Sequence, residues 1–236
     1  MRSQFTRSII NTSIKEAIFF FHNHHFPLPP FAYWTVNDWK NNTVKIDEIF
    51  ATKLGWDVTD FGSGNFRKIG RIIFTLRNGH AQMRKMYPKP YAHKVMYLLE
   101  DQKSPVHYHR SKMEDIINQG GGETVVRVWE KTGKGSLSRK NVSLVVDGVR
   151  IFVQAGGTIL LKPGQSVTIP PGLYHSYWAE RGKGPVLSIE ISSVNDDTND
   201  NYFLGRNIRF PKVKEDEEAL YLLVSDYDNY LRRKHI

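Results

Sequence analysis

A pair of histidines and a glutamate lie close together in the stretch SPVHYHRSKMEDIINQGG near the middle of the chain. His107 and His109 are separated by one residue, so on a β-strand both side chains leave the same face and can converge on one ion. Glu114 follows after a turn and can return to that ion as an anionic oxygen ligand. A second stretch, GQSVTIPPGLYHSYW, ends one strand at a Pro-Pro-Gly turn and starts another that carries His175. These four side chains are candidate ligands of one divalent metal ion.

The chemistry of such a set would be that of a Lewis acid with open positions. The chain has no cysteine, so thiolate sites are excluded, and three imidazoles with one carboxylate suit a hard or borderline metal. Two positions of an octahedron stay open for two neighbouring hydroxyl or carbonyl oxygens of a substrate. Taken singly, a histidine on a strand is more often a satisfied polar residue, and Glu114 beside Lys112 can be a solvated ion pair. The combination of all four favours metal binding.

The elements that must position these residues are short strands. From about residue 69 the chain consists of runs rich in β-branched and aromatic residues, separated by Gly, Pro, Asn and Asp. Seven or more short strands with turn signals between them are typical of an antiparallel sandwich or barrel, not of a βαβ array. The runs are GRIIFTLRNG, KVMYLLED, ETVVRVWEK, VSLVVDGVRIFV, GTILLKPGQSVTIPP, YHSYWAE and VLSIEISS.

We expect helices at both ends of the chain. Ser13 and Glu16 form a capping-box pattern, which predicts a helix of roughly 12 residues ending near His25. Prolines and the aromatic stretch FAYWTVNDW follow, and they are expected to pin an N-terminal arm onto the main body. The stretch EDEEALYLLVSDYDNYL predicts a C-terminal helix with acidic residues in its first turn. The chain is therefore expected to be one structural unit, with an arm over residues 1–68 and a barrel plus C-terminal helix over residues 69–236.

The composition and charge of the chain limit the kinds of partner that it is expected to bind. The 236 residues carry a formal net charge of +9, but the basic residues are scattered, so nucleic-acid binding is not expected. The apolar run near residue 20 is short and preceded by charges, which does not suit a signal peptide, and a cytoplasmic protein is the default expectation. No long uncharged apolar stretch predicts a membrane span. The clustered His22, His24 and His25 are read as a polar helix end or a subunit contact, since their spacing does not place them on one face.

The two histidine-bearing stretches resemble the paired motifs of the cupin superfamily. This resemblance implies a cupin-type antiparallel β-barrel, or jelly roll, as the fold of a mainly β chain. Two positions depart from the motifs: Asp101 stands where the first usually opens with Gly, and Ala179 where the second usually ends with Asn. Both positions shape turns and do not alter the ligand set. The matching positions are His107, His109, Glu114 and Gly121 in the first motif and Gly164, Pro170, Gly172 and His175 in the second.

Sequence features beyond the two cupin motifs resemble the D-lyxose isomerase family of cupin-type sugar isomerases. The resemblance runs from about residue 13 to residue 223, and its most specific elements are the HYHRSKMED run and the SSVNDD stretch. It implies interconversion of an aldose and a ketose, D-lyxose with D-xylulose and often D-mannose with D-fructose, by a proton moved between C1 and C2 through a cis-enediol. It also implies Mn²⁺ as the one metal ion per chain, although Zn²⁺, Fe²⁺, Co²⁺ or Ni²⁺ are compatible with these ligands.

Five further residues are candidates for catalysis and sugar binding. Lys112 and Glu190 are assigned to catalysis. Lys94 is assigned to sugar binding, and both lysines fall where the family pattern has lysines. Ser188, Glu190 and Ser192 alternate with apolar residues, so Glu190 points into the barrel if the apolar set packs outward under another layer. Asp197 and Arg209 are further sugar-binding candidates, although the acidic run around Asp197 is also ordinary turn chemistry.

One departure from the family pattern bears on activity. The isomerases tend to carry an acidic residue and a proline between the Phe and the RFP of the last segment, and here Gly205 stands in that region. If that acid is the family's base, Glu190 or another carboxylate must replace it, or the sugar preference shifts. Arg206 and Arg209 would equally suit a phosphorylated or carboxylated sugar.

Two other functions share the same ligand set. A cupin-type iron-dependent oxygenase would consume oxygen, and a non-catalytic sugar-binding cupin would bind sugar without changing it. Hydride shift remains open beside proton transfer. Because antiparallel barrels have edges to cover, a homodimer is expected.

Overall fold

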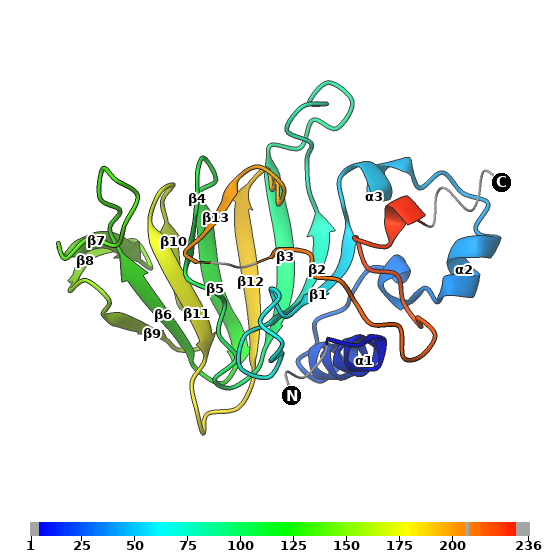
Figure 1. Ribbon diagram of the computed structural model, residues 1–236, viewed down its shortest axis with the longest axis horizontal. Helices are drawn as coiled ribbons and strands as arrows, with labels where there is room; N and C mark the ends of the chain where they lie inside the picture. Colours follow the sequence, from blue (N-terminus) through cyan, green and yellow to red (C-terminus); the bar gives the residue numbers. More distant parts are fainter. Residues whose placement is uncertain (1–4, 206–207, 230–236) are drawn as a thin grey trace.

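The fold consists of two antiparallel β-sheets that face each other, with helices gathered at one end (Figure 1). A computed structural model describes residues 5–205 and 208–229. The first sheet has eight strands in the order β1-β2-β3-β12-β5-β10-β7-β8, and the second has five in the order β13-β4-β11-β6-β9. The strands are β1 (Gly55–Thr59), β2 (Arg71–Arg77), β3 (Tyr91–Leu98), β4 (His107–His109), β5 (Glu114–Gly121), β6 (Thr124–Trp129), β7 (Val142–Val146), β8 (Val149–Val153), β9 (Thr158–Leu161), β10 (Ser166–Ile169), β11 (Tyr174–Ala179), β12 (Val186–Ser193) and β13 (Asn201–Phe203).

This architecture confirms the expected mainly β, jelly-roll class, with one correction. The strand patterns in the sequence predict a barrel, whereas the described strands form two separate sheets without a hydrogen-bonded closure between them. The strands also begin earlier than expected. Residues 55–59 lie inside the segment assigned to the N-terminal arm, yet they form β1, which pairs with β2 over its whole length.

Alternation along the central strands sorts side chains into two layers. On β12, Leu187 and Ile189 pack outward into a cluster with the N-terminal helix. Glu190 follows Ile189 and, by the alternation, faces the interior, where it lines a cavity between the sheets. Away from this polar region, the space between the sheets is filled by an apolar core that includes Met96, Ile116 and Val126. The interior is therefore apolar at one end and polar at the other, and the polar end holds the candidate site.

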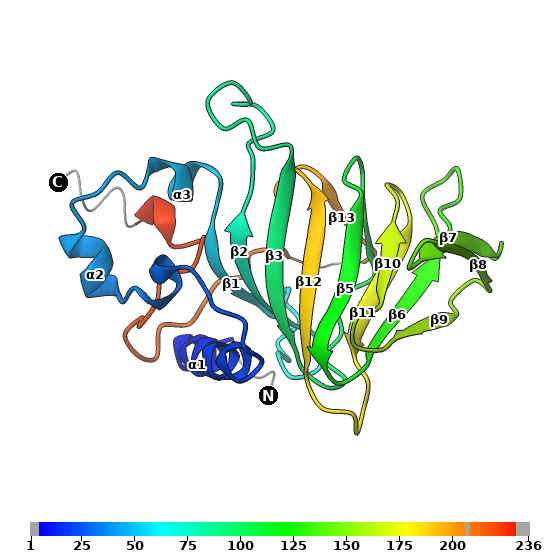
Figure 2. The same ribbon diagram turned by 180° about the vertical axis from the view of Figure 1, so that it is seen from behind.

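Helix α1 (Arg7–Asn23) covers the outer face of the large sheet. It begins earlier than the predicted start at Ser13, because Thr6 is the N-cap and its side chain accepts a hydrogen bond from the backbone of Ile9. Ser13 is instead buried within the helix. Three shorter helices complete the arm: η1 (Pro30–Tyr33), α2 (Val36–Asn41) and α3 (Asp47–Ala51). They lie beyond β1, at the end of the molecule opposite β7 and β8 (Figure 2).

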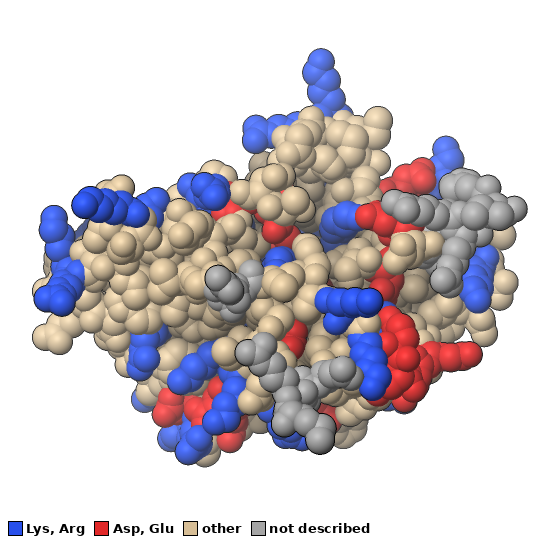
Figure 3. Space-filling model, viewed as in Figure 1, with Lys and Arg blue, Asp and Glu red and all other residues tan. Residues whose placement is uncertain are grey.

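The predicted C-terminal helix is wrong over residues 215–226. This segment has no helix; only residues 227–229 are helical, and residues 230–236 lie outside the described part of the chain. The reason is that its apolar run contacts β1 through an isolated parallel bridge between Leu223 and Trp56, where the backbone N–H of Val224 donates to the carbonyl of Trp56 and Leu223 is buried. The acidic residues before it pair with α1: Glu215 binds Arg7 at 2.8 Å. Acidic side chains gather over this region at the lower right of Figure 3.

No helix in the described part of the chain is long and apolar enough to cross a membrane.

Candidate metal and sugar site

Three histidines from two adjacent strands meet in the interior. His107 and His109 lie on β4, and His175 lies on β11 directly opposite His107 in the pairing register. All three are buried, and their ligand-capable nitrogens lie within 4.8 Å of one another. The one-residue spacing on β4 therefore does place both side chains on the same face, and the second stretch supplies the third imidazole.

Backbone carbonyls orient two of these rings. The Nδ1 of His107 lies 2.8 Å from the carbonyl of Pro105, and the Nδ1 of His175 lies 3.1 Å from the carbonyl of Leu173. With the proton on Nδ1 in each ring, Nε2 keeps its lone pair free. The Nε2 of His175 is buried and makes no well-aligned hydrogen bond among the described residues, although an oxygen of Glu114 lies 2.9 Å away, as expected of two ligands that face one cation.

Glu114 completes a donor set that suits a divalent cation. Its two carboxylate oxygens lie 2.9 Å from Nε2 of His175 and 3.2 Å from Nε2 of His109. Burial is the largest single effect and opposes its ionisation, but Lys112 and the contacts with His109 and His175 together outweigh burial and hold the pKa of Glu114 well below its ordinary value. Burial, with His175 and His109 nearby, lowers the pKa of His107 well below 6.5. Three imidazoles thus converge in a buried space, with the carboxylate of Glu114 beside two of them, and these residues fit a bound metal ion.

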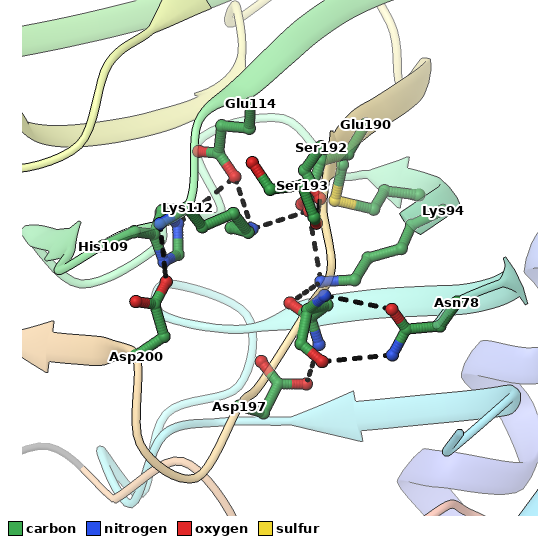
Figure 4. A network of polar contacts seen from close by, with 12 residues as sticks. Asn78, Lys94, His109, Lys112, Glu114, Glu190, Ser192, Ser193, Asp197 and Asp200 are labelled. Atoms are coloured by element: carbon green, nitrogen blue, oxygen red, sulfur yellow. Dashed lines mark hydrogen bonds and ion pairs between the residues drawn. The ribbon is translucent and has the colours of Figure 1, made fainter. Parts of the chain in front are cut away.

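A second carboxylate lies beside the first, bridged by lysines (Figure 4). Nζ of Lys112 lies 2.7 Å from Glu114 and 2.7 Å from Oε1 of Glu190, and Nζ of Lys94 lies 3.2 Å from the same oxygen. All four side chains are buried. Burial raises the pKa of Glu190, but Lys112 and Lys94 outweigh it, so the net shift is downward. Glu190 is therefore ionised at neutral pH and held between two ammonium groups.

Residues 194–200, here termed the acidic loop, contact charged side chains of the site. Asn195 accepts a hydrogen bond from Nζ of Lys94 at 2.7 Å. Asp197 pairs with Arg209 at 3.2 Å, and Asp57 of β1 contacts the same Nη2 atom. The other terminal nitrogen, Nη1, is buried without a hydrogen-bond partner among the described residues. Arg209 therefore has a free donor at the edge of the cavity that it lines.

The cavity enclosed by these groups is small but not isolated. Its volume is about 40 Å³, enough for a few water-sized groups. Two aromatic rings form part of its wall: Phe203 lies 5.5 Å from His107 and 5.6 Å from Phe61 between ring centroids. A hollow of about 440 Å³ adjoins it, and Lys112 lines both spaces. A bound sugar thus has room on the side of Lys112.

The structure brings together all of the predicted site residues that lie within its described part. The expected residues around one cavity are Lys94, His107, His109, Lys112, Glu114, His175, Glu190, Asp197 and Arg209. Gly205 is exposed and has a φ of +87°, so this position forms a backbone turn that favours glycine. Arg206 lies outside the described residues.

Sequence reasoning missed three charged residues of the site. Arg71 is fully buried, donates to the backbone carbonyls of Gly70 and Gln102, and lies 4.1 Å from the ring centre of Tyr177. Its inward direction follows from alternation with Ile72 on β2, so the strand pattern contained a signal. Asp57 and Asp200 had no such signal, because each depends on a partner far away in the chain.

Comparison with known proteins agrees with this geometry. A family model described as D-lyxose isomerase matches residues 5–227. The chain is 44% identical over 225 residues to the D-lyxose/D-mannose isomerase of Escherichia coli O157:H7, covering 95% of this chain and 99% of that protein. It is 27% identical over 164 residues to the D-lyxose ketol-isomerase of Cohnella laeviribosi, covering 68% of this chain and 82% of that protein.

Solved structures show the same fold at low sequence identity. The L-ribose isomerase of Cellulomonas parahominis superposes with a TM-score of 0.56 at 14% identity, over 91% of this chain and 99% of that one. The L-ribose isomerase of Geodermatophilus obscurus gives 0.57 at 16% identity, over 91% and 100%.

Proposed function

Because this chain belongs to the D-lyxose isomerase family, we propose that it is a metal-dependent ketol-isomerase that interconverts D-lyxose with D-xylulose, and D-mannose with D-fructose. The observation that carries this proposal is the pair of buried carboxylates in one cavity. Glu114 faces three imidazoles, and Glu190 lies next to it across Lys112. One carboxylate can hold a metal while the other moves a proton.

The proposed metal ligands are His107, His109, Glu114 and His175. A divalent ion held by them would supply Lewis acidity toward the carbonyl and hydroxyl oxygens of the sugar. Mn²⁺ is the proposed ion, because three nitrogens and one oxygen accept it and the family resemblance implies it. Elemental analysis of the purified protein tests the identity of the metal.

Glu190 is the proposed proton carrier. It takes the proton from C2 of the aldose and returns it to C1, while the proton of the C2 hydroxyl passes to the oxygen at C1, so the intermediate is a cis-enediol and no net proton is consumed. In the sugar-free protein its two lysine partners lower its pKa, which makes it a weak base. We therefore expect a sugar hydroxyl to draw at least one ammonium group away on binding, which raises the basicity of Glu190.

Lys112 and Lys94 have complementary roles in this proposal. Lys112 lines both the cavity and the adjoining hollow, so its ammonium can turn from Glu190 toward the oxygens at C1 and C2 and stabilise negative charge there. Lys94 stays anchored by Asn195 and holds a sugar hydroxyl. Arg209, kept in place by Asp197, offers its free Nη1 to a hydroxyl farther along the sugar.

Conversion of D-lyxose in deuterated buffer tests the proposal. Purified enzyme with MnCl₂ should form D-xylulose and incorporate solvent deuterium at the carbon that receives the proton. Glu190→Gln should lower kcat by about 10²–10⁴-fold, while Mn²⁺ binding persists. Glu123→Gln, the same change at a half-buried surface ion pair, is the control and should leave kcat unchanged.

Three results would contradict it. Full activity of His107→Ala after metal stripping would exclude the metal site. Turnover without deuterium uptake would favour a hydride shift. Sugar binding without any turnover, or oxygen consumption, would indicate a non-catalytic or an oxygenase cupin.

We also propose that the enzyme acts as a cytoplasmic homodimer. The edge strand β8 pairs with β7 and exposes Phe152 and Val149, with 74% and 63% of their surface accessible, and an apolar sheet edge of this kind favours pairing with a second copy. Gel filtration should give twice the mass of the chain, and Phe152→Lys should shift it to the monomer. Cell fractionation tests the compartment.

A further inference from the structure

Asp200, the last residue of the acidic loop, has a buried carboxylate that contacts the segment carrying Lys112 and also faces His109. Oδ1 accepts hydrogen bonds from the backbone N–H and the hydroxyl of Ser111, at 2.7 and 2.6 Å, and Oδ2 accepts from the backbone N–H of Lys112 at 3.2 Å. The backbone carbonyl of Asp200 accepts from Arg110 at 2.9 Å. Three consecutive residues between β4 and β5 are thus held by Asp200.

The same carboxylate faces a metal-site histidine. Oδ2 lies 3.8 Å from Nδ1 of His109 (Figure 4), which is longer than a hydrogen bond. This Nδ1 is buried and has no hydrogen-bond partner among the described residues. In the other two rings, His107 and His175, the Nδ1 atom already lies within hydrogen-bond distance of a backbone carbonyl. His109 differs in that its Nδ1 faces a carboxylate of the acidic loop instead.

We propose that Asp200 is a positioning residue of the isomerase. It fixes the backbone that carries Lys112 between Glu114 and Glu190, and it accepts a hydrogen bond from the Nδ1–H of His109 when the metal is bound, so that Nε2 faces the ion. An outer carboxylate of this kind raises the basicity of a ligating imidazole and fixes its tautomer. The inference rests on the proposed function for the identity of the site, but metal binding can test it without turnover.

The test is Asp200→Asn, measured by calorimetric titration of the metal-free protein with MnCl₂. The amide has nearly the shape of the carboxylate, yet only its oxygen can accept a hydrogen bond. If its oxygen faces Ser111, its N–H₂ group faces the N–H groups of Lys112 and His109. Two donors cannot form a hydrogen bond, so both contacts are lost. We expect the Kd for Mn²⁺ to rise about 10–100-fold and kcat to fall, with the KM for D-lyxose at saturating metal nearly unchanged.

Asp196→Asn is the matched control in the same loop. Asp196 accepts hydrogen bonds from the backbone of Thr198 and Asn199, at 3.1 Å each, and has no contact with the histidines or lysines of the site among the described residues. Its substitution should leave the Kd for Mn²⁺ at the wild-type value. A lower melting temperature for Asp200→Asn with unchanged Kd and kcat would show a merely structural role and overturn the proposal.

A measurement on the wild-type enzyme covers the case in which Asp200→Asn does not fold. In ¹⁵N-histidine-labelled, zinc-loaded protein, the Nδ1 proton of His109 should be observed as a slowly exchanging, hydrogen-bonded proton. Its absence would overturn the proposal. If instead the wild-type protein binds Mn²⁺ but converts no sugar, the proposed function fails, while the metal affinities still decide the role of Asp200.

Discussion

At the scale of single residues, the buried ion pairs define what each carboxylate can do. Lys112 contacts Glu114 and Glu190 at the same distance of 2.7 Å, and burial lowers its pKa less than these two carboxylates raise it. The two acids lie close enough to repel each other, so the lysine between them keeps both ionised. The same ammonium can then release Glu190 to act as a base without leaving the cavity.

Removing that ammonium should cost stability as well as activity. Lys112→Met leaves two buried carboxylates facing each other, and the free energy of unfolding of the metal-free protein should fall by about 3–5 kcal/mol. The double variant Lys112→Met with Glu190→Gln removes one of the two charges and should recover part of the loss. Urea denaturation of the three proteins checks this. A loss below about 1 kcal/mol, as for a surface pair, would contradict it.

At the scale of elements, the acidic loop supports several functional parts at once. Asn195 binds Lys94, Asp197 binds Arg209, and Asp200 binds the backbone of Lys112. The run of Asn and Asp in this loop could be read from the sequence as turn chemistry. In the structure the local turn contacts belong mainly to Asp196, whereas the other acids of the loop point toward the site.

The acidic loop should also contribute to acid sensitivity. Burial raises the pKa of Asp197, but Arg209 and Lys94 outweigh it and the net shift is strongly downward. A depressed pKa in the folded state contributes stability above the unfolded value of about 3.9, and this contribution is lost as the pH falls through the folded value. Asp197→Asn should therefore be less stable than wild type at pH 7 in EDTA, and the difference should shrink below about pH 4. A difference that is constant with pH, in urea denaturation at each pH, would contradict this.

The start of β1 depends on a glycine. Gly55 has a φ of +121°, and a Cβ there would lie 2.3 Å from the hydroxyl of Tyr227, which donates to the carbonyl of Leu54 at 2.6 Å. Gly55→Ala should lower the melting temperature clearly more than Gly148→Ala. Gly148 also has a positive φ, of +81°, but a Cβ there meets nothing within 4 Å, so only the backbone strain of about 1 kcal/mol remains. Equal effects in thermal denaturation would show that the Tyr227 contact is unimportant.

At the scale of the whole molecule, the proposed metal ligands come from both sheets. His107, His109 and His175 come from the five-stranded sheet, and Glu114 comes from the eight-stranded sheet. A bound ion would therefore connect two layers that otherwise touch through the apolar core. Binding of a ligand to the native state alone adds about 2.7 kcal/mol of stability at a concentration of 100 times its Kd.

Chelation should accordingly lower the melting temperature, and MnCl₂ should restore it. His175→Ala should melt at the same temperature with or without Mn²⁺, because this variant has lost an imidazole that would bind the ion together with Glu114. Differential scanning fluorimetry with EDTA and added metal measures both. An unchanged melting temperature of the wild-type protein on chelation would contradict the role of the ion in joining the sheets.

The sequence by itself determined the class of fold and predicted the four candidate metal ligands. The spacing of His107 and His109 is sufficient because a strand repeats every two residues. The motif glycines at 121, 164 and 172 all have φ between +82° and +90°, where glycine is favoured, and Asp101 adopts a φ of +57° at the position where the motif usually has Gly. The inward direction of Glu190 also followed from alternation, once α1 covered Leu187 and Ile189.

Only the tertiary structure decided the rest. The apolar run near residue 223 suits a helix by its local pattern, yet it forms no helix because the edge of β1 offers backbone partners that no local pattern reveals. Arg71, Asp57 and Asp200 join the site through partners far away in the chain, and such pairings depend on how the sheets face each other. Local periodicity reports which face a side chain leaves, whereas its neighbour across the cavity is set by packing of the whole chain.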